Sequence, residues 1–254
     1  MNFKLLVFIA MLFSSPAVFA CICSPESLTE IYQKSHVVAK VKILKLTPDA
    51  IDQRYHHAAI EMVTLYKGEP LTKIYIESEL NTSCAFLPLI NSTWIIFASV
   101  WQGKISFGMC SGSIQLDTTF DTVLYPNATE NHDSSVKMTQ QILQYLSDHD
   151  IQKPNPIGLF SFNEGLNTIK GYNNDNKFAV FQVDVNADLS VNKIKTLTKF
   201  QNNKLTKAVL YSMKSDLKFV KANPRVVSNP NKIIIFCYFH KNQNDEYGYV
   251  SLIN

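Results

Sequence analysis

The chain has 254 residues, of which 46% are hydrophobic and 18% are charged, and its formal net charge is +3. This composition is typical of a globular protein and excludes a largely disordered chain. The length is sufficient for two modest domains. A net charge of +3 without a dense basic stripe argues against a nucleic-acid partner, because a phosphate-binding face needs clustered lysine and arginine.

The first twenty residues have the pattern of a secretory signal peptide. Lys4 gives a positive start, residues 5–13 form an apolar stretch, and residues 18–20 end in small side chains where a signal peptidase cuts. The apolar stretch is too short to cross a bilayer, which takes about 20 residues, and no later segment reaches that length. We therefore predict a signal peptide at residues 1–20 and a secreted or periplasmic protein with no transmembrane segment.

Cleavage after Ala20 would make Cys21 the first residue of the mature protein. Ordinary signal peptidase would leave a free α-amine on Cys21, whereas lipoprotein processing would acylate Cys21 and anchor it to a membrane. Phe19 is a poor match to the small residue that a lipoprotein signal has before Ala20. The sequence therefore favours the free amine, with a lipid anchor at Cys21 as the alternative.

The chain contains five cysteines, which are Cys21, Cys23, Cys84, Cys110 and Cys237. Cysteines of an exported protein are usually paired in disulfides. Metal ligation by Cys21 and Cys23 is the rival interpretation, but the first four cysteines lack paired CxxC spacing and no histidine cluster accompanies them. A bridge from Cys21 to Cys23 would be strained, so each is expected to pair with a distant cysteine. Cys237 lies in an apolar run and is expected to be a buried free thiol.

Alternating hydrophobicity and turn residues predict several short strands in the first half of the chain. The predicted elements are a helix over 25–34 opened by Ser24, strands over 36–46, 58–66, 73–78, 94–100 and 104–109, and a helix over 136–146. Short strands at this spacing are typical of a small barrel, with the second helix packed on its side. Trp94 and Trp101 are expected in the barrel core.

The composition shifts toward Asn, Pro and Gly around residues 148–176, which predicts a domain boundary and a linker over 151–175. Beyond it the pattern predicts a β-β-α-β unit. Its expected elements are strands over 178–185 and 190–199, a helix over 204–214 and a last strand over 232–239. The expected fold class is therefore mainly β plus α+β. An N-terminal OB-like five-stranded barrel with flanking helices over 21–150 would precede a small α+β domain over 176–254.

The first hundred residues of the mature chain resemble the tissue inhibitors of metalloproteinases. Four stretches over residues 21–120 carry the resemblance: Cys21-Ile22-Cys23-Ser24-Pro25, His36 to Val41, Leu65-Tyr66-Lys67-Gly68, and Ser83-Cys84 followed by Trp94 to Ala98 and Cys110. The resemblance implies a netrin-like OB fold and the disulfides Cys21–Cys84 and Cys23–Cys110. The family's third bridge in this domain and its cysteine-rich second domain have no counterpart, so the chain is most similar to sparser, bacterial-type members.

Members of this family inhibit zinc proteases with the α-amine and carbonyl of their first residue, which fill the open coordination position of the zinc. The resemblance therefore implies that Cys21 chelates the zinc of a metalloprotease partner. The implied contact ridge consists of Ile22, Cys23, Ser24, Pro25, Ser83 and Cys84. Ile22 stands where the family usually has Ser or Thr, so small protease pockets should exclude it. No cofactor and no metal of its own are expected.

Residues 176–240 resemble, more loosely, the TonB C-terminal domain. The resemblance rests on residues 181–191, the helix over 205–213 and residues 217–222. The family usually has Gly where this chain has Leu189. The resemblance implies an envelope protein as partner, so the alternative function is a non-catalytic envelope adaptor in which an edge strand within 178–239 pairs with the partner. Cys21 and Cys23 would then only staple the N-terminus to the barrel.

No arrangement typical of an enzyme is visible, so we expect a protein without catalytic residues. His56 and His57 with Glu61 could suggest a metal patch, but adjacent residues of a strand point to opposite faces, and surface histidines are the expectation. Asp184 and Asp188 flank a turn, and turn chemistry explains them without calcium.

Overall fold

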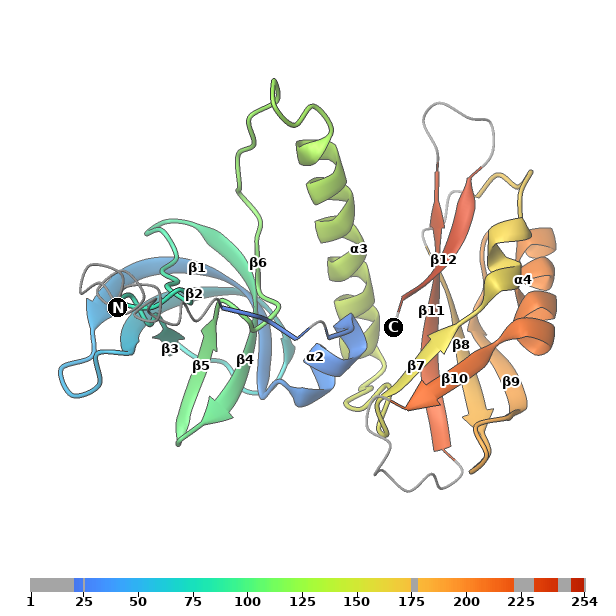
Figure 1. Ribbon diagram of the computed structural model, residues 1–254, viewed down its shortest axis with the longest axis horizontal. Coiled ribbons are helices and arrows are strands. Elements are labelled where there is room, and N and C mark those ends of the chain that lie inside the picture. The colour runs from blue at the N-terminus through green and yellow to red at the C-terminus, as the bar shows by residue number, and fades with distance from the viewer. Residues whose placement is uncertain (1–20, 25, 175–177, 222–230, 242–247, 254) are drawn as a thin grey trace, which may run out of the picture.

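The computed structural model describes residues 21–24, 26–174, 178–221, 231–241 and 248–253. The predicted signal peptide, residues 1–20, and Pro25 lie outside the described residues. A barrel and a second sheet lie on opposite sides of one long helix, α3 (Ala128–Asp148; Figure 1). Among the described residues, no helix has the length and apolar character needed to cross a membrane.

The first half of the chain forms the predicted OB-like five-stranded barrel. Its strands pair in the order β1-β2-β3-β5-β4, and pairing of β1 with β4 closes the barrel. The pairing of β3 with β5 is parallel, and the other pairings are antiparallel. The strands are β1 (Val37–Pro48), β2 (Tyr55–Lys67), β3 (Lys73–Glu77), β4 (Thr93–Trp101) and β5 (Lys104–Gly108), with a short β6 (Ile114–Gln115) beside β4. The predicted barrel strands are therefore confirmed, with ends shifted by at most three residues.

The two tryptophans of β4 have different environments. Trp94 is 8% exposed and packs edge-on against Phe86 in the barrel core, as predicted. Trp101 is 60% exposed, so the prediction that it lies in the core is wrong. Pairing of β4 with β1 ends at Ala98, and β4 then continues only as one arm of the β4–β5 hairpin. Trp101 is therefore on a projecting hairpin, beyond the closed part of the barrel.

Helix α2 (Leu28–Lys34) begins three residues later than predicted. Its N-cap is Ser27, because the Ser27 hydroxyl accepts from the backbone N–H of Glu30 and the Glu30 carboxylate accepts from the Ser27 N–H. This reciprocal capping box satisfies two amides of the first turn, so Ser24 is not the cap. At the other end, Lys67 Nζ donates to the carbonyls of Tyr32 and Gln33 at 2.7 and 3.0 Å. These contacts fix α2 on the barrel.

Helix α3 (Ala128–Asp148) begins eight residues before the predicted helix and packs against both sheets. One face of α3 carries the fully buried residues Ile142, Leu143 and Leu146. These belong to the same core cluster as Tyr32, Val38, Tyr66, Ile95 and Phe97 of the barrel side and Val180 and Phe236 of the second sheet. The barrel and the second sheet therefore share one core through α3, which we call the shared core.

The second sheet has the order β12-β11-β8-β9. Its elements are β8 (Phe178–Val185), β9 (Val191–Thr198), α4 (Asn203–Asp216), β11 (Asn231–His240) and β12 (Tyr249–Ile253). The predicted β-β-α-β unit is present, but the strand over 232–239 is not the last, because β12 pairs antiparallel with β11. Alternate residues of β8 point to α4 on one face and to the shared core on the other. Cys237 of β11 is fully buried and is a free thiol, as predicted.

Residues 151–174, the described part of the linker predicted over 151–175, contribute to the core of the second sheet. They contain β7 (Leu159–Phe162), which pairs antiparallel with β10 (Lys218–Lys221), and the short 3-10 helix η1 (Glu164–Thr168). Leu159, Leu166 and Ile169 of this segment are buried beside α4. In the sequence these three residues are seven and three positions apart, with Phe, Ser, Asn, Glu, Gly and Thr between them, so no regular apolar period is visible.

The β8–β9 turn forms as the sequence suggests. Asp188 accepts from the backbone N–H and the hydroxyl of Ser190 at 2.9 and 2.6 Å, which is ordinary turn chemistry. Leu189 occupies the left-handed region with φ of 69°, the conformation for which glycine is suited. The turn therefore forms around a residue that pays a conformational cost there.

Candidate functional site

Two disulfides hold the first described residues on the barrel. Cys21 is bonded to Cys84 and Cys23 to Cys110, with Cα–Cα distances of 5.0 and 5.1 Å. The bridges connect positions 63 and 87 residues apart in the sequence. This is the pairing that the resemblance implied. It joins the N-terminal segment to two separate loops of the barrel.

The loop that carries Cys84 is itself anchored in the barrel. Phe86 donates its backbone N–H to the carbonyl of Ser78 at 2.8 Å, and its ring packs edge-on against Trp94 and Phe107. The Cys84 N–H donates to the Thr82 hydroxyl at 3.0 Å. Cys84 is therefore a firm attachment point for Cys21.

The second attachment point, Cys110, follows β5 in a tight turn. The hydroxyl and the backbone N–H of Ser111 both donate to the carbonyl of Gly108. Gly112 has φ of 74°, and a Cβ at this position would lie 2.6 Å from the Ile31 side chain of α2. The turn therefore packs closely on α2, and the positive φ of Gly112 favours glycine at this position.

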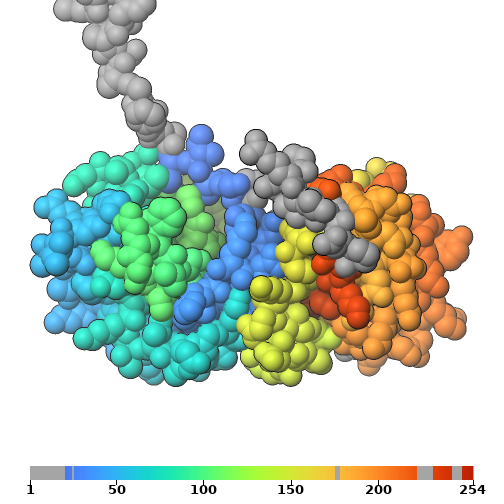
Figure 2. Space-filling view, turned by 90° about the horizontal axis from the view of Figure 1, so that it is seen from below, coloured from blue at the N-terminus to red at the C-terminus, as the bar shows by residue number. Residues whose placement is uncertain are grey.

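The segment between the two bridges is presented to solvent. Ile22 is 87% exposed, and Cys23 and Ser24 are also exposed. Ser83 is exposed beside Cys84. Figure 2 shows the blue start of the described chain on the surface of the barrel. The structure thus brings together all residues of the predicted contact ridge except Pro25, which lies outside the described residues.

The bridged cysteines also form a sulfur cluster. The Sγ atoms of Cys21, Cys23 and Cys110 all lie within 4.8 Å of one another. Metal ions bind cysteine as the thiolate, whereas each of these sulfurs is bonded to another sulfur. The cluster could hold a metal ion only after both bridges were reduced.

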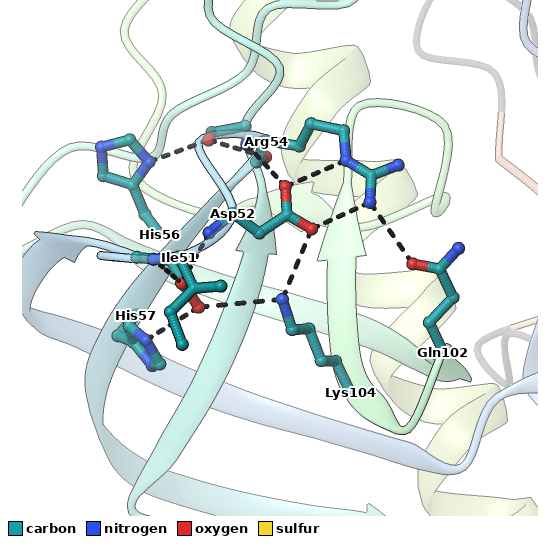
Figure 3. A network of polar contacts seen from close by, with 9 residues as sticks. Ile51, Asp52, Arg54, His56, His57, Gln102 and Lys104 are labelled. Carbon is teal, nitrogen blue, oxygen red and sulfur yellow. Dashed lines mark hydrogen bonds and ion pairs between the residues drawn. The ribbon is translucent and has the colours of Figure 1, made fainter.

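A polar network pins the β1–β2 turn to the β4–β5 hairpin (Figure 3). Arg54 donates two hydrogen bonds to the Asp52 carboxylate, at 3.0 and 2.8 Å, and Lys104 Nζ lies 3.6 Å from Asp52 and 3.7 Å from Asp49. The hydrogen bond from Arg54 holds the pKa of Asp52 well below its usual range. Arg54 and Lys104 therefore supply two positive charges for the two carboxylates, and His57 Nε2 also lies 3.1 Å from Asp49. We interpret the network as structural.

His56 and His57 lie on opposite faces of β2, as expected. The prediction of surface histidines is wrong for His56, which is 8% exposed and shares a hydrogen bond of 2.8 Å between its Nδ1 and the Ser78 hydroxyl. His57 contacts Asp49 and the Tyr75 ring instead. Glu61 is exposed. The two histidines and Glu61 therefore do not form a metal patch.

The sequence did not reveal a groove of about 560 Å³ beside α2. Glu77 and Trp101 are among its lining residues. The alternation of β3, with Ile74 and Ile76 buried, could have indicated that Glu77 points outward. The groove could not be predicted, because its lining residues come together only through the pairing of β3 with β5.

No protein-family model matches the chain, and comparison with curated proteins finds no match either. The resemblances to the two families therefore remain predictions from the quoted residues. Any function assigned to the ridge depends on the geometry of the bridged segment.

Proposed function

We propose that the mature protein, beginning at Cys21, is a secreted or periplasmic inhibitor of a zinc metalloprotease. One observation carries the proposal: two disulfides hold Cys21 and Cys23 on the barrel and leave Ile22 between them 87% exposed. Disulfides are compatible with an exported protein. Removal of the predicted signal peptide would free the α-amine at the fixed end of this segment.

The chemistry of the proposed contact is simple. A catalytic zinc keeps one coordination position open for water, and the α-amine and carbonyl oxygen of Cys21 would occupy it. An α-amine has a pKa near 8, so its proton is lost at low cost near neutral pH. Because the Cys21–Cys84 bridge already fixes this end of the chain, little conformational entropy remains to be lost on binding.

Ile22 would set which proteases bind. Its side chain would enter the pocket beside the zinc, where burial of an isoleucine is worth about 1.5–3 kcal/mol. That corresponds to about 10- to 150-fold in affinity. Proteases whose pocket is too small for a branched side chain should escape inhibition.

The test uses oxidised protein that begins at Cys21 and a panel of zinc metalloproteases with large and small pockets. A second form carries one additional Ala before Cys21, which displaces the α-amine. We expect inhibition by the first form only, because the extended form cannot place its amine on the zinc. Equal inhibition by both forms, or inhibition by neither, would reject zinc chelation.

The role of Ile22 is tested by Ile22→Ala, with Val123→Ala as the matched control. Val123 is also branched and is 88% exposed, but it lies in the loop before α3, away from the bridged segment. We expect Ile22→Ala to weaken inhibition of large-pocket proteases at least 10-fold and Val123→Ala to leave it within about twofold.

A second candidate is an envelope adaptor that binds by strand addition. It is favoured by β9, which among the described strands pairs only with β8 and so leaves one edge open. Its test is amide hydrogen exchange with and without solubilised envelope proteins. Slower exchange in β9, with unchanged exchange in the other edge strand β12, would support this candidate.

A further inference from the structure

The groove beside α2 lies on the outer face of β3, β5 and β4. Its floor is made of small residues, because strand register places Ser99 opposite Ser106 and Glu77 opposite Gly108. A Cβ at Gly108 would lie only 3.0 Å from the Cβ of Glu77. Small side chains on this part of the sheet therefore create the hollow.

The walls of the groove combine one aromatic ring with charged side chains. Trp101 stands at the end of β4 on the same outer face as Ser99 and is 60% exposed. Residues Glu26, Lys34 and Glu77 are the charged residues of the lining. The ring face of an exposed tryptophan attracts a cation that lies above it.

The charges of the groove do not balance. Two carboxylates and one ammonium group line it, and Lys34 is paired with Glu26 at 2.7 Å. Lys104, which pairs with Trp101 across the β4–β5 hairpin, has its Nζ 3.7 Å from Asp49 and 3.6 Å from Asp52. Within the part of the chain that the structure describes, the Glu77 carboxylate has no hydrogen bond or salt bridge. Partial burial and the nearby Glu79 carboxylate raise the pKa of Glu77, and Arg54, which is itself hydrogen-bonded to Asp52, opposes this rise. The groove therefore offers one carboxylate that has no cation in direct contact with it.

We propose that this groove binds an arginine side chain of a protein partner, with the guanidinium stacked on Trp101 and paired with Glu77. A guanidinium is planar and weakly hydrated, so it stacks on aromatic rings and pairs with a carboxylate more readily than an ammonium group does. The arginine supplies the directly paired cation that Glu77 lacks. The site is independent of zinc chelation, although Cys110 belongs both to the groove lining and to the bridge that holds Cys23.

The test is a titration with N-acetyl-arginine amide, with N-acetyl-citrulline amide as the uncharged ligand of the same shape. The chain has two tryptophans, and Trp94 is buried, so the indole N–H signal of Trp101 in an NMR spectrum reports on the groove. A single side chain is expected to bind with a Kd of about 1–10 mM. We expect arginine amide to shift the Trp101 signal and citrulline amide to leave it in place.

Glu77→Gln is expected to weaken arginine binding at least 10-fold. The matched control is Glu79→Gln, which removes a nearby carboxylate that is not part of the groove lining. It should leave the Kd within about twofold. An unchanged Trp94 signal establishes that each variant is folded. Equal shifts with arginine and citrulline, no shift with arginine, or full binding by Glu77→Gln would each overturn the proposal, whether or not Cys21 inhibits a protease.

Discussion

Replacing Phe236 with alanine is expected to destabilise the barrel together with the second sheet. Phe236 lies on β11, is fully buried and packs edge-on against the rings of Tyr145 and Phe178 at 5.6 and 5.7 Å. The same shared core includes Tyr66 and Phe97 of the barrel. A cavity at Phe236 would therefore remove packing that holds the barrel, α3 and the second sheet together.

The size of the effect follows from the buried ring. Truncation of a buried phenylalanine to alanine costs about 3–5 kcal/mol, because the lost transfer free energy adds to the cost of the cavity. For a chain of this length, 1 kcal/mol lowers Tm by about 2–4 °C. We therefore expect Phe236→Ala to lower Tm by about 6–20 °C.

The assay must report on the barrel alone. In a Trp101→Phe background, Trp94 is the only tryptophan of the chain, and it lies in the barrel core. Thermal unfolding followed by Trp94 fluorescence is compared with unfolding followed by far-UV circular dichroism, which reports on the whole chain. Tyr211→Ala is the control, since Tyr211 lies on α4 and is 76% exposed.

Both signals should move to the same lower Tm in Phe236→Ala and stay within about 2 °C of the parent in Tyr211→Ala. The reasoning is refuted if the Trp94 transition keeps its parent midpoint while circular dichroism shows an earlier, separate transition. That result would mean that the two sheets unfold independently, despite the shared core.

Three further predictions concern single positions. Gly68→Ala should lower the free energy of unfolding, measured in urea, by at least about 3 kcal/mol, and Gly103→Ala should lower it by about 1 kcal/mol. Both glycines have positive φ, but of these two positions only Gly68 would place a Cβ against a main-chain oxygen. Arg54 lowers the pKa of Asp52, so this ion pair stabilises the fold above about pH 5 and less as the pH falls below about 4. The difference in urea midpoint between the parent and Asp52→Asn should accordingly narrow from pH 5 to pH 2. Burial raises the pKa of Cys237, so a maleimide should label Cys237 only in denaturant, and rapid labelling without denaturant would contradict its burial.

Strand positions in the barrel could be predicted because their side chains alternate between the core and solvent. The alternation in β3, for example, places Ile74 and Ile76 inside and Glu77 outside. The prediction failed where tertiary contacts decide the environment. Trp101 has a large aromatic side chain of the kind usually buried in a core, but it lies beyond the end of the β1–β4 pairing. His56 is polar but lies inside, where Ser78 supplies a hydrogen-bond partner.

The candidate site was only partly accessible from the sequence. Cysteine spacing indicated that Cys21 and Cys23 pair with distant residues, but it left the partners open, and only the family resemblance implied them. The groove was not predictable, because its floor depends on the parallel pairing of β3 with β5, which brings Gly108 beside Glu77. No local pattern in the sequence determines which strands pair in this way.

The spacing of the two bridges has a consequence for how this protein can evolve. Cys21 and Cys23 are bonded to two different loops. The position of Ile22 on the barrel surface is therefore fixed as long as both bridges are intact. An insertion or deletion here would change the length of chain between two fixed points, whereas substitution of the exposed Ile22 leaves the barrel core untouched. Natural or laboratory selection could therefore vary the surface at position 22 one side chain at a time, at almost no cost to stability.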